Sequence, residues 1–119
     1  MRATTLADSI SVDQPRDGLA AVKAVLQSGG EAITVPDEAI LAAIPDIARS
    51  TGVFAEPAAA APWAAAKQMA QQKKIAEDEL VVCLVSGSGL KDIANAAAVV
   101  GKPLTVDSTI ESVNQALAR

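Results

Sequence analysis

The stretch "VVCLVSGSGLKD", residues 81–92, combines residue types that bind ligands with an abrupt change of pattern. An apolar, β-branched run ends at Ser86, and Gly87 and Gly89 follow before a segment with helical spacing begins. In an open parallel sheet, ligands bind beyond the carboxyl ends of strands, where loops and helix N-termini present backbone N–H groups. Ser86 is therefore a candidate ligand contact, although the spacing is neither a P-loop nor a dinucleotide fingerprint. An ordinary strand-to-helix turn is the alternative interpretation.

Other chemically active side chains lie in two further places. Glu56 directly precedes Pro57 at a predicted helix start, so its carboxylate either faces a ligand pocket or simply caps that helix. Lys91 and Asp92 are expected to form a local ion pair or to anchor the following helix, with a small effect on stability. Cys83, in the middle of the apolar run, is expected to be an inert buried thiol.

The elements that must position these groups alternate between helix and strand. Helical spacing and bounding Gly or Pro residues predict helices at about residues 18–28, 37–51, 58–70, 91–100 and 109–118. Short β-branched runs predict strands at residues 32–35, 80–85 and 103–106. The run "LVVCLV" at 80–85 is continuous rather than alternating, which is typical of a strand covered on both faces. The sequence therefore predicts an α/β fold in three layers, with a small, mostly parallel sheet and flanking helices.

Single residues predict how these helices begin and bend. Asp17 is the expected N-cap of the first helix, and Ser108 with Glu111 forms an expected capping box for the last. Pro45 removes a backbone donor and is expected to bend or split the second helix. Pro62 is a candidate for a second start within the third helix.

Composition excludes several classes of function. A chain of 119 residues is one domain at most, and we expect residues 1–119 to form a single partial domain. The formal charge of −4 and an aromatic content of 2% argue against nucleic-acid and anionic-membrane partners. With no histidine and one cysteine, neither a Cys/His metal site nor an intrachain disulfide is expected. No apolar run is long enough to span a bilayer, and we expect a reducing, cytoplasmic setting.

Three segments occur in a fixed order and spacing: "TLADSISVDQPRDG", "GVFAEPAAAA" and "VVCLVSGSGLKD". Their combination points to a protein family far more specifically than any one segment does. Together they resemble the C-terminal part of the threonine synthases, which are pyridoxal-phosphate enzymes of the tryptophan-synthase β fold (fold type II). The resemblance runs from about Thr4 to Val106. Serine and threonine dehydratases share the glutamate–proline and glycine-loop features more loosely.

The resemblance implies pyridoxal phosphate as the cofactor of the complete enzyme and a small amino-acid substrate. The family reaction is a carbon–oxygen lyase reaction that converts O-phosphohomoserine and water into threonine and phosphate. The resemblance places the Ser86 hydroxyl on the pyridine nitrogen and Glu56 at the same pocket, together with the loop Gly87, Ser88 and Gly89. Threonine synthases commonly have threonine at the position of Ser86, so a dehydratase relative remains an alternative.

The hydroxyl itself has a chemical consequence. A neutral hydroxyl cannot act as the counter-ion of a pyridinium, so the ring nitrogen is expected to stay largely unprotonated. A cofactor in that state is a weaker electron sink. Such a cofactor fits elimination and replacement chemistry better than reactions that need a long-lived carbanion.

The resemblance also implies that the chain holds only part of a site. The family's Schiff-base lysine, an asparagine at the ring hydroxyl and a phosphate cradle lie N-terminal to the matching region. None of the six lysines has a context that identifies that lysine: Lys23, Lys67, Lys73, Lys74, Lys91 and Lys102. We therefore expect no catalytic residue here, an inactive chain when alone, and as partner either further copies or the missing N-terminal part. A non-catalytic binding or self-association module is the alternative from another class.

Overall fold

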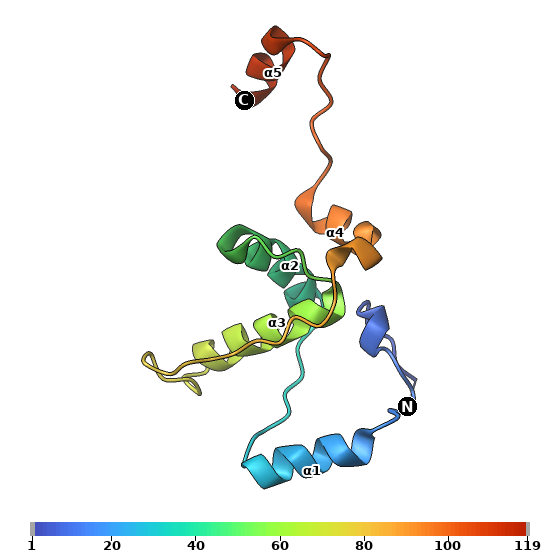
Figure 1. Ribbon diagram of the computed structural model, residues 1–119, viewed down its shortest axis with the longest axis vertical. Coiled ribbons are helices and arrows are strands. Elements are labelled where there is room, and N and C mark those ends of the chain that lie inside the picture. Colours follow the sequence, from blue (N-terminus) through green and yellow to red (C-terminus); the bar gives the residue numbers. More distant parts are fainter. Residues whose placement is uncertain (1, 119) are drawn as a thin grey trace.

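The computed structural model describes residues 2–118, and within this range it contains helices joined by extended segments. Figure 1 shows the helices in chain order, and a short 3₁₀ turn precedes α1 and another precedes α4. The helices are α1 (Gly18–Ser28), α2 (Asp37–Thr51), α3 (Pro57–Gln71), α4 (Ile93–Val100) and α5 (Ile110–Leu117), and the 3₁₀ turns are η1 (Asp8–Ile10) and η2 (Gly89–Lys91).

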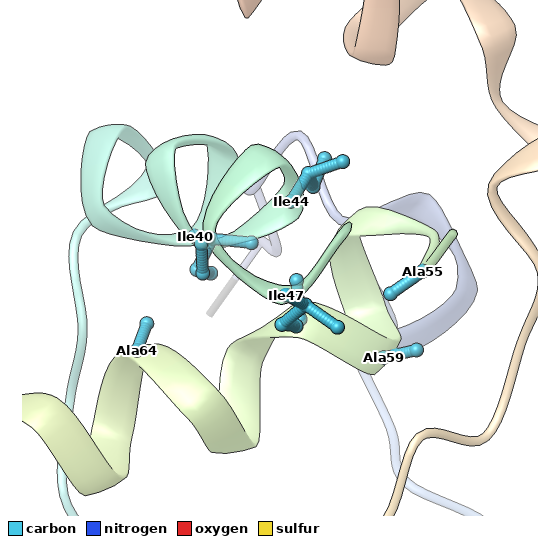
Figure 2. Packing of buried hydrophobic residues seen from close by; sticks show 8 residues of the cluster. Ile40, Ile44, Ile47, Ala55, Ala59 and Ala64 are labelled. Atoms are coloured by element: carbon cyan, nitrogen blue, oxygen red, sulfur yellow. The ribbon is translucent and has the colours of Figure 1, made fainter. Parts of the chain in front are cut away.

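The packing of α2 against α3 forms the hydrophobic core. Ile40 and Ile47 of α2 point toward an alanine-rich face of α3 that includes Ala59 and Ala64, whereas Ile44 projects from another side of α2 (Figure 2). All three isoleucines are buried in one cluster with these alanines. Alanine has no side chain beyond Cβ, so the two helices approach closely, and Ile40 and Ile47 fill the space between them. Burial of these apolar groups is the main stabilising contribution that this core makes.

Local chemistry explains where these two helices begin and end. Asp37 lies in the first turn of α2, where a carboxylate favours the helix dipole, and Gly52 ends the helix at a φ of 75°. Pro57 begins α3, where its missing N–H leaves no hydrogen bond unmade. The predicted helices at 37–51 and 58–70 are therefore confirmed. Both run through their internal prolines, Pro45 and Pro62, so neither proline splits its helix.

The other predicted helices are confirmed with changes at their ends. The first coincides with α1, although Asp17 stands at its N-cap without a side-chain capping bond among the described residues. The predicted helix at 91–100 begins only at Ile93, after the turn η2. In the last helix Thr109, rather than Ser108, is the cap, because its side chain accepts a hydrogen bond from the Ser112 amide.

The predicted three-layer α/β fold with a parallel sheet is wrong. Within residues 2–118 the strand-type pairing consists of a single antiparallel bridge, Ala55 to Ser88. The segments 32–35, 80–85 and 103–106 join helices instead of pairing with one another. The β-branched residues of these segments predict strands, but a segment becomes a strand only beside another strand that accepts and donates its backbone hydrogen bonds.

The segment at 80–85 shows what replaces the predicted sheet. It runs back along α3 (Figure 1), and its alternate residues Val81 and Cys83 line a groove of about 240 Å³ against that helix. The Cys83 thiol lies 3.8 Å from the Pro62 carbonyl oxygen and is half-buried rather than fully buried as predicted. The opposite face is solvent-exposed, with Leu80 at 89%, Val82 at 85% and Leu84 at 76%. The segment therefore has the two-faced geometry of a strand with only one face covered.

The molecule is more open than a compact domain of its length. Its radius of gyration is 18.1 Å, against about 13 to 14 Å expected for a compact chain of this size. Helices α1 and α5 lie away from the α2–α3 core (Figure 1), and no residue described in either helix is buried. Across the described residues, no helix has both the length and the apolar character needed to cross a membrane.

Candidate functional site

Glu56 is the buried charged residue at the centre of the candidate site. It occupies the N-cap position of α3 with extended backbone angles, and it is only 5% exposed. Its carboxylate makes no capping bond to the helix among the residues described. Capping of α3, the alternative interpretation of Glu56 in the sequence, therefore does not explain why its carboxylate is buried here.

The partners of Glu56 come from distant parts of the chain. The Ser9 hydroxyl donates a hydrogen bond of 3.0 Å to Oε2, and the Lys91 ammonium lies 3.2 Å from Oε2 and 3.4 Å from Oε1. Lys91 also donates to the Ser9 hydroxyl oxygen over 3.3 Å. These three residues form one hydrogen-bonded group, which we call the Glu56 clamp. A carboxylate this deeply buried is stable only because such partners compensate for its lost hydration.

The backbone next to Glu56 holds the glycine loop. The Glu56 amide donates to the Gly87 carbonyl over 3.0 Å, and the Gly89 amide donates to the Phe54 carbonyl over 2.9 Å. A Cβ atom built on Gly87 would lie 1.9 Å from Glu56 Oε1, and one on Gly89 would lie 2.3 Å from the Phe54 ring. A Cβ atom at either position would therefore force the Glu56 carboxylate or the Phe54 ring to move. The predicted glycine loop lies directly against the predicted glutamate.

The two serines of this loop differ in their surroundings. The Ser88 side chain accepts a hydrogen bond of 3.3 Å from the Leu90 amide and so caps the turn η2. Ser86 is exposed, and its hydroxyl has no hydrogen-bond partner within residues 2–118. Its hydrogen-bonding capacity is available to an external ligand.

Lys91 and Asp92 have separate partners instead of forming a local pair. Asp92 caps α4, with Oδ1 accepting from the Asn95 amide at 3.2 Å and Oδ2 accepting from the Asn95 side chain at 2.7 Å. Lys91 joins the Glu56 clamp. The expectation that this pair anchors the following helix is therefore met by Asp92, whereas Lys91 connects the loop to the start of α3.

A cavity of about 310 Å³ opens beside the clamp. Its walls contain both members of the ion pair and the beginnings of α3 and α4, and its lining residues are Asp8, Ser9, Glu56, Pro57, Ala58, Lys91 and Asp92. Polar groups of both charge signs converge on one concave surface, which is typical of a binding site.

Sequence reasoning missed Ser9 and misjudged Lys91. Ser9 lies 47 residues before Glu56, and Lys91 lies 35 residues after it. Hydrophobic periodicity reports only local structure and carries no signal for contacts at these separations. The available signal was that the three segments carrying the family resemblance contain Ser9, Glu56 and Lys91, one in each.

The residues at this site fit a contact to the ring nitrogen of pyridoxal phosphate. Ser86 offers a neutral, exposed hydroxyl that has no hydrogen-bond partner among the described residues. Glu56, the nearby carboxylate, already accepts from Ser9 and Lys91 through both of its oxygens, and only 5% of it is exposed. It is therefore not available as a counter-ion for a pyridinium. The group available to hydrogen-bond the ring nitrogen is therefore the Ser86 hydroxyl and not a carboxylate.

Comparisons with known proteins agree with the residue pattern. A family model described as "Pyridoxal-phosphate dependent enzyme" matches residues 2–87. A threonine synthase of Methanosarcina acetivorans is 38% identical over 113 residues, which are 95% of this chain and 28% of the relative. The threonine synthase of Methanocaldococcus jannaschii is 34% identical with the same coverage. One from Mycobacterium tuberculosis is 42% identical over 88 residues, covering 74% of this chain and 24% of the relative.

These matches establish the family. The chain belongs to the pyridoxal-phosphate dependent enzymes, and the resemblance to threonine synthases read from its sequence is confirmed. The chain spans about 28% of the length of the first of these relatives. The family model ends at Gly87, so it includes Ser86 but not Ser88, Gly89 or Lys91.

Proposed function

We propose that this chain forms part of a threonine-synthase-like carbon–oxygen lyase that converts O-phosphohomoserine and water into threonine and phosphate. The observation that carries the proposal is the placement of Ser86: an exposed hydroxyl at the end of an extended apolar segment, next to a loop fixed by Glu56. The similarity to three threonine synthases favours this reaction over that of a dehydratase.

Within this proposal, Ser86 donates a hydrogen bond to the pyridine nitrogen of pyridoxal phosphate. When bound, the cofactor supplies an electron sink for substrate carbon–hydrogen bond cleavage. Ser86 keeps the ring nitrogen unprotonated because a hydroxyl, unlike a carboxylate, offers no negative charge to a pyridinium. The backbone of Gly87, Ser88 and Gly89 holds Ser86 in place, and Glu56 fixes that backbone.

We also propose that the chain alone does not turn over substrate. The family resemblance places the Schiff-base lysine N-terminal to the matching region. Three of the six lysines of this chain are instead bound to carboxylates within it: Lys67 to Asp46, Lys74 to Glu31 and Lys91 to Glu56. Purified chain titrated with pyridoxal phosphate and reduced with borohydride is expected to show no saturable labelling of one lysine. Saturable labelling of a single lysine would contradict this part of the proposal.

A chimaera tests the reaction directly. The region of the Methanosarcina acetivorans threonine synthase that matches this chain is replaced by the corresponding residues of this chain. The chimaera is expected to release phosphate from O-phosphohomoserine. Ser86→Ala is expected to weaken cofactor binding by about three- to tenfold, the effect of one lost neutral hydrogen bond, while Ser86→Thr retains binding because it keeps the hydroxyl. A soluble, folded chimaera without cofactor absorbance or phosphate release would refute the proposal.

One observation favours a second candidate function, a binding or self-association module. The exposed face of segment 80–85 is apolar, because it consists of Leu80, Val82 and Leu84. An extended segment with one uncovered apolar face pairs readily with a strand from another polypeptide. In the first proposal the same face binds the remainder of a threonine-synthase-like enzyme. In the second it binds further copies of this chain.

We infer a cytoplasmic setting as part of the proposal. The single cysteine, Cys83, is a half-buried thiol and has no second cysteine with which to form an intrachain disulfide. Free thiols of this kind are typical of reducing compartments.

A further inference from the structure

The Glu56 clamp joins three segments that are separate in sequence. Ser9 belongs to η1 in the N-terminal segment, Glu56 is the N-cap of α3, and Lys91 ends the turn η2. Figure 1 shows the N-terminal segment lying beside the start of α3, near α4. This segment is also fixed at a second point, because the Thr5 hydroxyl and the Leu6 amide both donate to the Asp37 carboxylate at the start of α2.

The orientation of the Glu56 carboxylate and the shape of the glycine loop depend on each other. Oε1 lies so close to Gly87 that a Cβ there would be 1.9 Å away, and the Glu56 amide holds the Gly87 carbonyl at 3.0 Å. A rotated carboxylate would lose its contact with the Gly87 backbone and its partners Ser9 and Lys91 together. Buried polar groups that share partners in this way act as one unit.

We propose that Lys91 and Ser9 are positioning residues for the loop that carries Ser86. They fix the Glu56 carboxylate, the carboxylate and amide of Glu56 fix Gly87, and Gly87 fixes the backbone from which the adjacent Ser86 hydroxyl projects. The part of this inference that concerns the cofactor depends on the proposed function. The part that concerns the loop depends only on the contacts within the chain.

The two partners of Glu56 differ in what each must supply. Lys91 is 61% exposed at its side chain and supplies a positive charge to a carboxylate that is nearly buried. Arginine also carries that charge and reaches a carboxylate with several donors, so Lys91→Arg is expected to preserve the clamp. Methionine has a similar length without charge, so Lys91→Met leaves the buried carboxylate uncompensated.

Amide hydrogen exchange on the full 119-residue chain tests the loop. Lys91→Met and Ser9→Ala are expected to raise the exchange rates of the Glu56 and Gly89 amides about tenfold, while amides in the α2–α3 core change little. Lys91→Arg is expected to restore slow exchange. Lys67→Met is the matched control, because it breaks the exposed ion pair with Asp46 and leaves the clamp intact. Unchanged loop exchange in Lys91→Met, or an equal increase throughout the core, would overturn the inference.

Cofactor affinity in the chimaera tests the link to Ser86. Lys91→Met is expected to raise the dissociation constant for pyridoxal phosphate severalfold while the chimaera keeps its folded circular dichroism spectrum, and Lys91→Arg is expected to restore the affinity. Faster loop exchange with unchanged cofactor affinity would overturn the positioning role while leaving the proposed function in place. An unsubstituted chimaera that binds no cofactor would instead defeat the proposed function, and the exchange experiment would still decide whether the clamp holds the loop.

Discussion

At the scale of single residues, Gly87 allows a carboxylate to lie directly against the backbone. Any other residue would place a Cβ atom 1.9 Å from Glu56 Oε1. The contact involves the start of the α3 helix and the loop before α4, so neither side can shift without moving the other. The small size of this glycine therefore serves the packing of the site more than conformational freedom.

Gly87→Ala is expected to destabilise the chain by about 1–3 kcal/mol, because the added methyl group overpacks a site already in contact. Urea unfolding followed by the fluorescence of Trp63, the single tryptophan, measures this change. Gly30→Ala is the matched control, since its nearest neighbour is the exposed Ser28 hydroxyl at 3.1 Å. Equal stability of the two variants would contradict the close contact at Gly87.

At this scale, the sequence names candidates only inside short motifs. Local pattern singled out Ser86, the glycine loop and Glu56 as candidates, and the family resemblance supplied their roles at the cofactor, which stay predictions. The contacts of Ser9 and Lys91 with Glu56 could not be predicted from local pattern, because they depend on how three segments meet in space. Exposure of the Ser86 hydroxyl likewise depends on packing.

At the scale of elements, the pairing of α2 with α3 provides most of the buried core. Helices were predicted well because propensity, caps and apolar spacing act within each segment. The sheet was predicted wrongly because a strand depends on partners elsewhere in the chain. In the described residues, the partner of segment 80–85 is the side of α3, and the only strand-type bridge joins Ala55 to Ser88.

Ile44→Ala is expected to destabilise the chain by about 2–5 kcal/mol, because Ile44 is the largest fully buried side chain of the core cluster and its truncation leaves a cavity. Thermal unfolding followed by circular dichroism at 222 nm measures the effect. Ile93→Ala, at an exposed position in α4, is the matched control and is expected to change stability by less than about 0.5 kcal/mol. Similar losses in the two variants would show that the core is not where the structure places it.

Val82→Lys is expected to reduce concentration-dependent association of the chain without lowering its melting temperature. Val82 lies on the uncovered face of segment 80–85, and a charge there disfavours pairing with another strand. Sedimentation velocity over a range of concentrations measures the association. Leu26→Lys, on the exposed surface of α1, is the control. If both substitutions reduce association equally, general surface hydrophobicity, and not this segment, is responsible.

At the scale of the whole molecule, tertiary contacts are unevenly distributed among the helices. The α2–α3 pair, the clamp and α4 are connected by packing and hydrogen bonds, whereas α1 and α5 contribute no buried residue among those described. Isolated helices of their length are marginal in water. Apolar side chains such as Leu19 and Leu117 remain largely exposed on them.

Amides of α1 and α5 are therefore expected to exchange with solvent at least about a hundredfold faster than those of α2, because opening a helix without tertiary contacts requires little free energy. Exchange measured residue by residue by NMR on the full chain checks this expectation. Protection in α1 equal to that in α2 would mean that α1 has a packing partner in solution.

The Glu56 clamp also determines which changes of chain length the protein tolerates. Ser9 and Glu56 are separated by 47 residues and Glu56 and Lys91 by 35, so each contact closes a long loop. The entropy of loop closure grows only with the logarithm of length, and a doubling adds about 0.6 kcal/mol. Insertions in the turn after α3, at residues 72–79, are therefore nearly neutral. Deletion of one residue between Gly87 and Lys91 would instead move the Lys91 ammonium away from the Glu56 carboxylate. The chain is therefore expected to tolerate insertions at residues 72–79 but no shortening of the loop at residues 87–91.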